Sequence, residues 1–434
     1  MTERESKNKF LSGNWYPVEE TSTNELKITG ELPRELSGLF LRNGPNPKAP
    51  INHENYHPFF GDGMIHGIRV EDGKALWYKN KFVTSPFGFG PNTHVLKHGE
   101  KIYALVEGGV SPVIMDSEMN FLEEEPFPAA DNKRFTAHPK IDSDTGEMHA
   151  VSYDFGEYVN GSGQVHYVTI DSNGKLIKDQ IIETPSRPMV HDCAITKNYV
   201  LIFDLPVTFN LGRRDDDNNP IGGDYPVIWN DKHTSRVGLQ NKKTDEIIWI
   251  EVNPGFLFHI VNSYEDKNGK VVLDFCRYER LFDFDNPLPM GQKPFLTRWI
   301  LDPKTKTCSE EMLDDRPMEF SRVHPDFDGK QHRFGYLLND GRLNNYFKHD
   351  FEKSETIAHD FGESCQAAEP VFIPKKNAKS EDDGFVVGFV YDKTTDLSDF
   401  VILDAQNFSD APLARVTLPQ RVPFGFHGSW INLD

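Results

Sequence analysis

The stretch DSDTGEMHAVSYDFGEYVNGSGQVHYVTIDSNGK (142–175) indicates most clearly how this chain folds. It contains two runs rich in β-branched and aromatic residues, EMHAVSYDF and QVHYVTI, which are typical of β-strands. The flanking segments DSDTGE and DSNGK are typical of tight turns, because Asp, Asn and Gly adopt backbone angles that other residues avoid. The stretch therefore predicts β-strands joined by short turns.

The same pattern continues outward along the chain. Further strands are predicted at KIYALVEGG (101–109), YVLIFDLP (199–206), EIIWIEV (246–252), KVVLDFCRY (270–278), LTRWILD (296–302), GFVVGFVYD (384–392) and DFVILDA (399–405). Helical periodicity is nearly absent, although the segment Met115–Phe121 is compatible with a short helix. Many short, evenly spaced strands fit a β-sandwich, a β-barrel or a β-propeller. A chain of 434 residues is longer than a sandwich or barrel usually fills, so an all-β propeller is favoured.

No linker-like segment divides the chain, so residues 1–434 are expected to form a single β-propeller domain. Residues 1–25 are expected as an N-terminal extension. The polar segment Arg213–Tyr225, rich in Gly and Pro, predicts a long surface loop. Such loops, inserted between blades, would form a cap.

Charge and cysteine content restrict the classes of function. The chain has 47 basic and 67 acidic residues, a formal net charge of −20. Such a surface repels phosphate backbones, so nucleic acid is not an expected partner.

The four cysteines form no CxxC pair, which argues against a disulfide framework or a thiolate zinc site. A cytoplasmic protein without an obligate protein partner is expected, with a peripheral membrane contact left open.

Four of the sixteen histidines stand beside apolar or aromatic residues near the ends of predicted strands: His138, His191, His259 and His427. They are far apart in sequence, unlike the ligands of a finger-type or helix-borne metal site. Different blades of a closed ring would bring such residues to a shared axis, and imidazole is the commonest ligand for Fe, Zn and Cu. Spacing alone leaves two interpretations, a metal site or four buried core histidines.

Six blocks, in order along the chain, carry a family resemblance. They are LRNGPNP (41–47), FFGDGMIHG (59–67), AHPKIDSDTGE (137–147), MVHDCAIT (189–196), FHIVNSYED (258–266) and FHGSWI (426–431). The chain from about Gly38 onward resembles the carotenoid cleavage oxygenases. The resemblance implies a seven-bladed β-propeller with one Fe(II) on its axis and a cap of loops and short helices.

The resemblance also assigns roles to residues. The four iron ligands correspond to His138, His191, His259 and His427. Three glutamates that orient the ligands correspond to Glu107, Glu319 and Glu369. The match around Glu319 is looser, because the family more often has Pro where Ser321 stands. A threonine near the open iron position corresponds to Thr93.

These residue types suit the implied reaction, in which O2 cleaves a conjugated C=C bond to give two carbonyl products. Four neutral imidazoles leave the full charge of the dication on iron and two neighbouring positions of an octahedron open. This differs from the two-histidine, one-carboxylate site of other iron oxygenases. Each of the implied glutamates can accept a hydrogen bond from a remote ring N–H, which would fix the tautomer and the ring plane of the histidine.

The expected substrate is a lipophilic polyene held in an apolar tunnel. Candidate lining residues flank the ligands or strand ends, although core packing is the alternative for each: Phe155, Phe256, Phe258, Phe426 and Trp430. Family members that cleave phenolic stilbenes carry a lysine where this chain has Val106. An apolar residue gives a phenolate no partner, so a carotenoid or apocarotenoid is expected, with a lignostilbene as the alternative.

Two other classes of propeller are compatible with the strand pattern. A propeller that only binds partners would hold no iron. A calcium-dependent lactonase would need clustered Asp, Asn and Glu oxygens on its axis. Four histidines in apolar surroundings favour a softer metal than calcium.

Overall fold

The computed structural model describes residues 8–48, 51, 56–85, 90–124, 135–159, 163–209, 227–283 and 292–433. Contacts divide the chain into unit 1 (Met1–Val106, Val110–Pro126 and Phe334–Asp434) and unit 2 (Glu107–Gly109 and Phe127–Arg333). The loop predicted at Arg213–Tyr225 lies outside the described residues. The expectation of a single domain stays a prediction.

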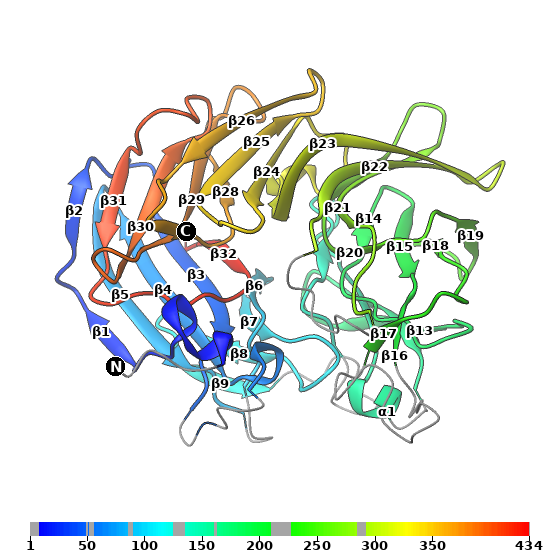
Figure 1. Ribbon diagram of the computed structural model, residues 1–434, viewed down its shortest axis with the longest axis horizontal. Helices are drawn as coiled ribbons and strands as arrows, with labels where there is room; N and C mark the ends of the chain where they lie inside the picture. The colour runs from blue at the N-terminus through cyan, green and yellow to red at the C-terminus, as the bar shows by residue number, and fades with distance from the viewer. Residues whose placement is uncertain are drawn as a thin grey trace. The chain divides into compact units, whose positions relative to one another are not determined.

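The described residues form antiparallel sheets with few helices, which confirms the all-β class (Figure 1). The helical elements are α1 (Phe155–Val159) and the short 3-10 helices η1 (Lys9–Leu11), η2 (Gly13–Trp15), η3 (Pro58–Phe60) and η4 (Pro325–Phe327).

The strands of unit 2 form sets with the orders β10-β11-β12-β13, β14-β15-β18-β19 and β20-β21-β22-β23, beside the hairpin β16-β17. Their bounds are β10 (Lys140–Ile141), β11 (Met148–Ser152), β12 (Val165–Ile170), β13 (Leu176–Ile182), β14 (Ala194–Ile195), β15 (Tyr199–Asp204), β16 (Val207–Phe209), β17 (Val227–Trp229), β18 (Arg236–Asn241), β19 (Ile247–Glu251), β20 (Phe256–Glu265), β21 (Val271–Tyr278), β22 (Phe295–Asp302) and β23 (Thr307–Arg322).

The strands of unit 1 form sets with the orders β1-β5-β4-β3-β32, β6-β7-β8-β9, β24-β25-β26 and β2-β31-β30-β29-β27, with β28 also paired to β29. Their bounds are β1 (Thr21–Thr23), β2 (Lys27–Gly30), β3 (Gly38–Pro45), β4 (Gly63–Glu71), β5 (Lys74–Phe82), β6 (His94–His98), β7 (Lys101–Leu105), β8 (Val113–Met115), β9 (Phe121–Glu124), β24 (Phe334–Asn339), β25 (Asn345–Asp350), β26 (Glu355–Asp360), β27 (Cys365–Ala367), β28 (Val371–Pro374), β29 (Gly384–Asp392), β30 (Leu397–Asp404), β31 (Ala414–Thr417) and β32 (Gly428–Asn432).

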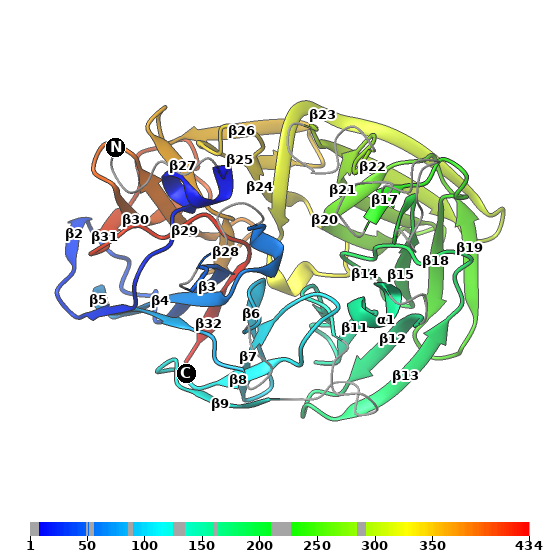
Figure 2. The ribbon, with the colours of Figure 1, turned by 60° about the horizontal axis from the view of Figure 1, so that its bottom comes forward.

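Burial differs between the strands of a set. In the set that Figure 2 shows from β11 to β13, every residue of β11 and β12 is buried, whereas β13 alternates between partly buried and exposed positions. The sequence LIKDQII of β13 has the period of two that one solvated face requires. In this set β11 and β12 therefore hold buried side chains, and β13 turns one face to solvent.

The segment Met115–Phe121 does not form the short helix with which its sequence is compatible. It closes the β8–β9 hairpin, because the Asp116 carboxylate accepts hydrogen bonds from the N–H groups of Glu118 and Asn120 at 2.9 and 2.8 Å. Met119 adopts a left-handed backbone (φ +62°). An aspartate that binds its own backbone in this way favours a turn over a helix.

Unit 1 joins segments from opposite ends of the sequence. Strand β32 pairs with β3, from Gly38 opposite Asn432 to Arg42 opposite Gly428. Strand β2 pairs with β31 in the same antiparallel manner. The β3–β32 pairing places His427, which directly precedes β32, at the end of the sheet that contains β3 and β4.

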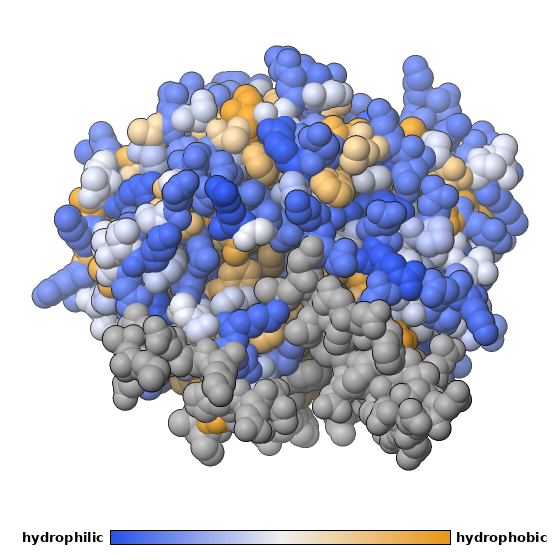
Figure 3. Space-filling view, in the orientation of Figure 1, coloured by the Kyte–Doolittle hydropathy of each residue, from blue (hydrophilic) through white to orange (hydrophobic). Residues whose placement is uncertain are grey.

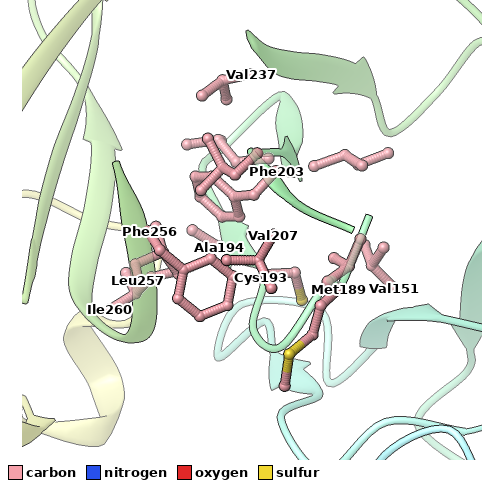
Figure 4. Close-up of a cluster of buried hydrophobic side chains, with 14 of the residues drawn as sticks. Val151, Met189, Cys193, Ala194, Phe203, Val207, Val237, Phe256, Leu257 and Ile260 are labelled. Atoms are coloured by element: carbon pink, nitrogen blue, oxygen red, sulfur yellow. The ribbon is translucent and has the colours of Figure 1, made fainter. Parts of the chain in front are cut away.

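Each unit has its own hydrophobic core. The largest cluster of unit 2 joins strands from all three of its sets, and Figure 4 shows the part where Phe256 of β20 lies beside Val207 and Cys193. A cluster of unit 1 centres on β29, β30 and β4. Each fully buried Val, Leu or Phe contributes about 1.5–3 kcal/mol. The face shown in Figure 3 is mainly hydrophilic, with small separate apolar areas.

Candidate metal centre

Three of the four singled-out histidines come together in unit 2. One ring nitrogen each of His138, His191 and His259 lies within 4.8 Å of the others. The ring centroids are 4.6 Å apart for His138 and His191, 5.2 Å for His138 and His259, and 5.4 Å for His191 and His259. Three imidazoles at these distances suit a shared metal ion, since they are a common donor set for Fe and Zn.

The local sequence explains why these side chains converge. His138 lies two residues before β10, His191 lies three residues before β14, and His259 lies within β20. Each of these strands is the first of its set. Strand β20 also has irregular pairing with β21 around Ile260, and such bulges redirect side chains next to functional sites.

Glu107 orients His191. Nδ1 of His191 lies 2.5 Å from a carboxylate oxygen of Glu107, and the hydroxyl of Tyr153 donates to the other oxygen. Burial opposes the protonation of His191, but the Glu107 charge raises the pKa of His191 above its ordinary value. Sequence reasoning missed Tyr153, since nothing in the strand EMHAVSYDF distinguishes it from a core tyrosine.

Glu319, on β23, is hydrogen-bonded to Nδ1 of His259. The same carboxylate accepts the N–H of Phe320 at 2.7 Å, and the ring of Phe320 stacks on His259 with centroids 4.9 Å apart. Phe320 holds a left-handed backbone (φ +51°), which sequence alone did not indicate. Burial raises the pKa of Glu319 to about 8, and a divalent cation nearby would lower it.

The hydrogen bonds determine which ring atoms face the metal site. Because the carboxylates take Nδ1 of His191 and His259, Nε2 is the nitrogen left for a metal on each ring. Ligating histidines in proteins commonly bind a carboxylate through the other nitrogen in this way. Phe258 adds an apolar edge, with its ring 4.9 Å from that of His191. The donor set therefore fits a metal ion bound by imidazole.

Unit 1 contains the other expected residues. Nδ1 of His427 lies 2.8 Å from Glu369, whose second oxygen accepts the N–H of Gly428 at 2.9 Å. The carbonyl of Thr93 accepts the N–H of His427 at 3.0 Å. His427 and Glu369 are both buried, so this pair repeats the pattern found at His191 and His259.

Arg42 supports the segment that leads to His427. Its Nη1 donates to the carbonyl of Pro423 at 2.7 Å, and its guanidinium packs against Gly425 so closely that a Cβ there would lie 2.6 Å from Cζ. Burial lowers the pKa of Arg42 to about 10, against the opposing charge of Glu369. The block LRNGPNP contains this residue, but sequence gave it no role.

Comparisons with known proteins identify the family. Residues 15–87 and 90–432 match the family model described as retinal pigment epithelial membrane protein. A carotenoid cleavage oxygenase of Mycobacterium tuberculosis is 34% identical over 98% of each chain. The chain belongs to the carotenoid cleavage oxygenase family.

Solved structures of this family have the same fold. A lignostilbene dioxygenase of Pseudomonas brassicacearum matches with a TM-score of 0.87 and 25% identity, over 98% of this chain and 99% of that one. The cobalt-substituted apocarotenoid oxygenase of Synechocystis matches with a TM-score of 0.84 and 25% identity, over 95% and 96%. These structures are seven-bladed propellers, which confirms the expected fold class. The chain is an oxygenase of the carotenoid cleavage family.

The residues expected to line a substrate tunnel occupy different surroundings in this oxygenase. Phe256 and Phe258 belong to the unit 2 core, and Phe155 of α1 packs against that core. Phe426 lies near Phe59, with ring centroids 6.0 Å apart, and Trp430 packs against the unit 1 cluster. Val106 is buried. Their role as tunnel residues stays a prediction.

The helices among the described residues of this chain are short. Among the described residues, no helix has the length and apolar character needed to cross a bilayer.

Proposed function

We propose that this oxygenase is an Fe(II)-dependent dioxygenase that cleaves one conjugated C=C bond of a carotenoid or apocarotenoid. Both atoms of O2 enter the products, so that one alkene and one O2 give two carbonyl compounds. The observation that carries the proposal is the convergence of His138, His191 and His259, two of them oriented by buried or half-buried glutamates.

The proposed iron ligands are these three histidines and His427. Two observations support His427. It lies in one of the family blocks, and its Nδ1 is hydrogen-bonded to Glu369, just as Nδ1 of His191 and Nδ1 of His259 are each hydrogen-bonded to a glutamate. A neutral ligand set leaves the charge of the dication uncompensated by its ligands, and the bound metal would supply the activation of O2 and of the alkene. A relative of known structure accepts cobalt.

The side chains around the histidines would determine how the metal is held. Glu107, Glu319 and Glu369 fix the tautomers, so that each Nε2 lone pair is available. Phe258 and Phe320 cover ring surfaces of His191 and His259 and keep water from them. Thr93, joined to His427 through its carbonyl, is proposed to lie near the open metal position, as the resemblance implies.

The proposed substrate is an all-carbon polyene. Val106 is apolar and buried, and it stands where stilbene-cleaving members carry a lysine. The name of the M. tuberculosis relative refers to carotenoids, whereas the P. brassicacearum relative is a lignostilbene dioxygenase. We propose a lipophilic partner, a cytoplasmic location and no nucleic-acid partner, in line with the net charge of −20.

The proposal predicts which chromophore disappears. The iron-loaded protein is expected to bleach an apocarotenal, with two carbonyl products by mass, and to leave resveratrol unchanged. Absorbance and product masses measure this, and protein prepared with zinc serves as the control. Bleaching of resveratrol alone would favour the lignostilbene alternative. A protein purified with Fe(II) that contains only trace iron would rule out the iron enzyme.

Glu319→Gln is expected to weaken metal binding without removing a ligand. The amide keeps the size of the side chain but is a weaker acceptor for Nδ1 of His259, and losses of this kind cost about 10-fold to 100-fold in metal affinity. Competition with a chelator measures the affinity. Glu311→Gln, on the exposed part of the same strand β23, is the matched control and should bind metal as the parent does. Equal affinity in both variants would contradict the role of Glu319.

A further inference from the structure

The carboxylate of Asp192 accepts hydrogen bonds from three segments of unit 2. Asp192 is only 3% exposed. Its Oδ1 accepts the N–H of Cys193 at 2.7 Å and lies 3.0 Å from Nζ of Lys140. Its Oδ2 accepts the N–H of Ile260 at 3.2 Å and lies 3.3 Å from the same Nζ. One buried side chain thus joins three stretches of chain that are distant in sequence.

Each of these stretches carries one of the clustered histidines. Asp192 follows His191 directly, Ile260 follows His259 directly, and Lys140 lies two residues after His138. The spacing between a ligand and its contact with Asp192 is therefore at most two residues in every case. The carboxylate binds the backbone near His191 and His259 and the Lys140 ammonium near His138, so it links the three histidine-bearing segments.

The backbone around His259 is suited to this contact. The pairing of β20 with β21 is irregular on both sides of Ile260. The Ile260 N–H is bound by Asp192, so a side chain from the His191 segment fixes the bulge. Cys193 reinforces the arrangement, because its Sγ donates to the carbonyl of His138 at 3.6 Å. Figure 4 shows Cys193 and Ile260 within the buried cluster of unit 2.

We propose that Asp192 is a positioning residue that sets the mutual distances of His138, His191 and His259 and thereby the affinity and geometry of their metal ion. This inference rests on the metal site proposed above. A carboxylate that only neutralised Lys140 would need no backbone partners. The two backbone N–H contacts, at Cys193 and Ile260, lie within two residues of different histidines, and they distinguish this positioning role from that of an ordinary buried ion pair.

Asp192→Asn tests the proposal. The amide keeps the size of the side chain and one acceptor oxygen, but it places an NH2 group against the N–H of Cys193 or Ile260 and loses the charge that binds Lys140. We expect the dissociation constant for Co(II), measured on the whole chain by chelator competition, to rise about 10-fold to 100-fold. We also expect the visible absorption bands of bound Co(II), which report ligand geometry, to shift.

Asp274→Asn is the matched control. Asp274 is fully buried in unit 2 and binds Arg298 through both oxygens at 2.7 and 2.8 Å. Among the described residues its other ion pair, at 3.6 Å, is with His332 and not with one of the three clustered histidines. This variant should lower the thermal midpoint of the metal-free protein and leave the Co(II) affinity and spectrum unchanged. If Asp192→Asn binds Co(II) with an affinity within twofold of the parent, or if Asp274→Asn loses as much affinity, the positioning role of Asp192 is overturned.

Lys140→Met provides a second variant in case Asp192→Asn does not fold. It keeps the length of the side chain, removes the ammonium and leaves both amide contacts, so a smaller, severalfold loss of Co(II) affinity is expected. If the Co(II) affinity of Lys140→Met equals that of the parent, the contact between Lys140 and Asp192 does not help to position His138. The failure of the inference is distinct from that of the proposed function, because a parent chain that binds neither Co(II) nor Fe(II) contradicts the metal site itself.

Discussion

His259→Ala is expected to lose both metal and turnover while keeping the fold. The imidazole is one of three whose ring nitrogens lie within 4.8 Å of one another, and its removal also leaves Glu319 without its histidine partner. The variant keeps three of the four proposed ligands, and only two of the three that converge in unit 2, and each lost ligand directly reduces the affinity for a divalent ion. We therefore expect iron content to fall from about one per chain to background.

Metal analysis after purification with Fe(II) and product formation from an apocarotenal measure the two losses. Circular dichroism and the thermal midpoint of the metal-free chain report the fold. His166→Ala is the matched control, because His166 is as buried as His259, at 8% exposure, and also binds a carboxylate through Nδ1, that of Asp179. A His259→Ala protein that retains iron and activity would show that the ligand assignment is wrong.

Arg42→Met is expected to reduce the free energy of unfolding by about 3–5 kcal/mol. Arg42 is 2% exposed, and its Nη1 donates to the carbonyl of Pro423, four residues before His427. The positive charge of Arg42 also attracts the negative charge of buried Glu369. Replacement by Met leaves that carbonyl unsatisfied and removes a nearby positive charge from Glu369, and both changes are costly in a buried site.

The loss is measured from urea unfolding of the metal-free protein, followed by fluorescence. Arg69→Met is the same substitution at a partly exposed position, where Arg69 pairs with the more exposed Glu71 at 3.1 Å. Exposed ion pairs contribute about 0–1 kcal/mol, so the control should lose no more than that. Equal losses in the two variants would mean that Arg42 has no special structural role.

The strands were predictable from sequence because their signal is local. GFVVGFVYD, read as a strand, is β29 with the same bounds, Gly384–Asp392. Alternation of side chains and turn residues requires only neighbouring positions, and these are visible in any sequence. The short helix compatible with Met115–Phe121 was wrong because one aspartate, Asp116, binds two backbone N–H groups and closes a hairpin instead.

The candidate site was predictable only in part. Apolar neighbours singled out His138, His191 and His259, and the family resemblance grouped them with His427. Tyr153, Phe320, Asp192 and Arg42 were not found, because each acts through a partner distant in sequence or through an unusual backbone angle. Partners of this kind are fixed by tertiary packing, which leaves no local pattern to read.

The pairing of β3 with β32 has a consequence for folding during synthesis on the ribosome. Arg42 and its partner Pro423 are 381 residues apart. At about 5–20 residues per second, roughly 20–75 s of synthesis separate the emergence of β3 from that of its last neighbour. During that interval one edge of β3 has no native strand to pair with, and unpaired edges are prone to aggregate. Chaperone supply and slow expression at low temperature should therefore improve the yield of soluble protein.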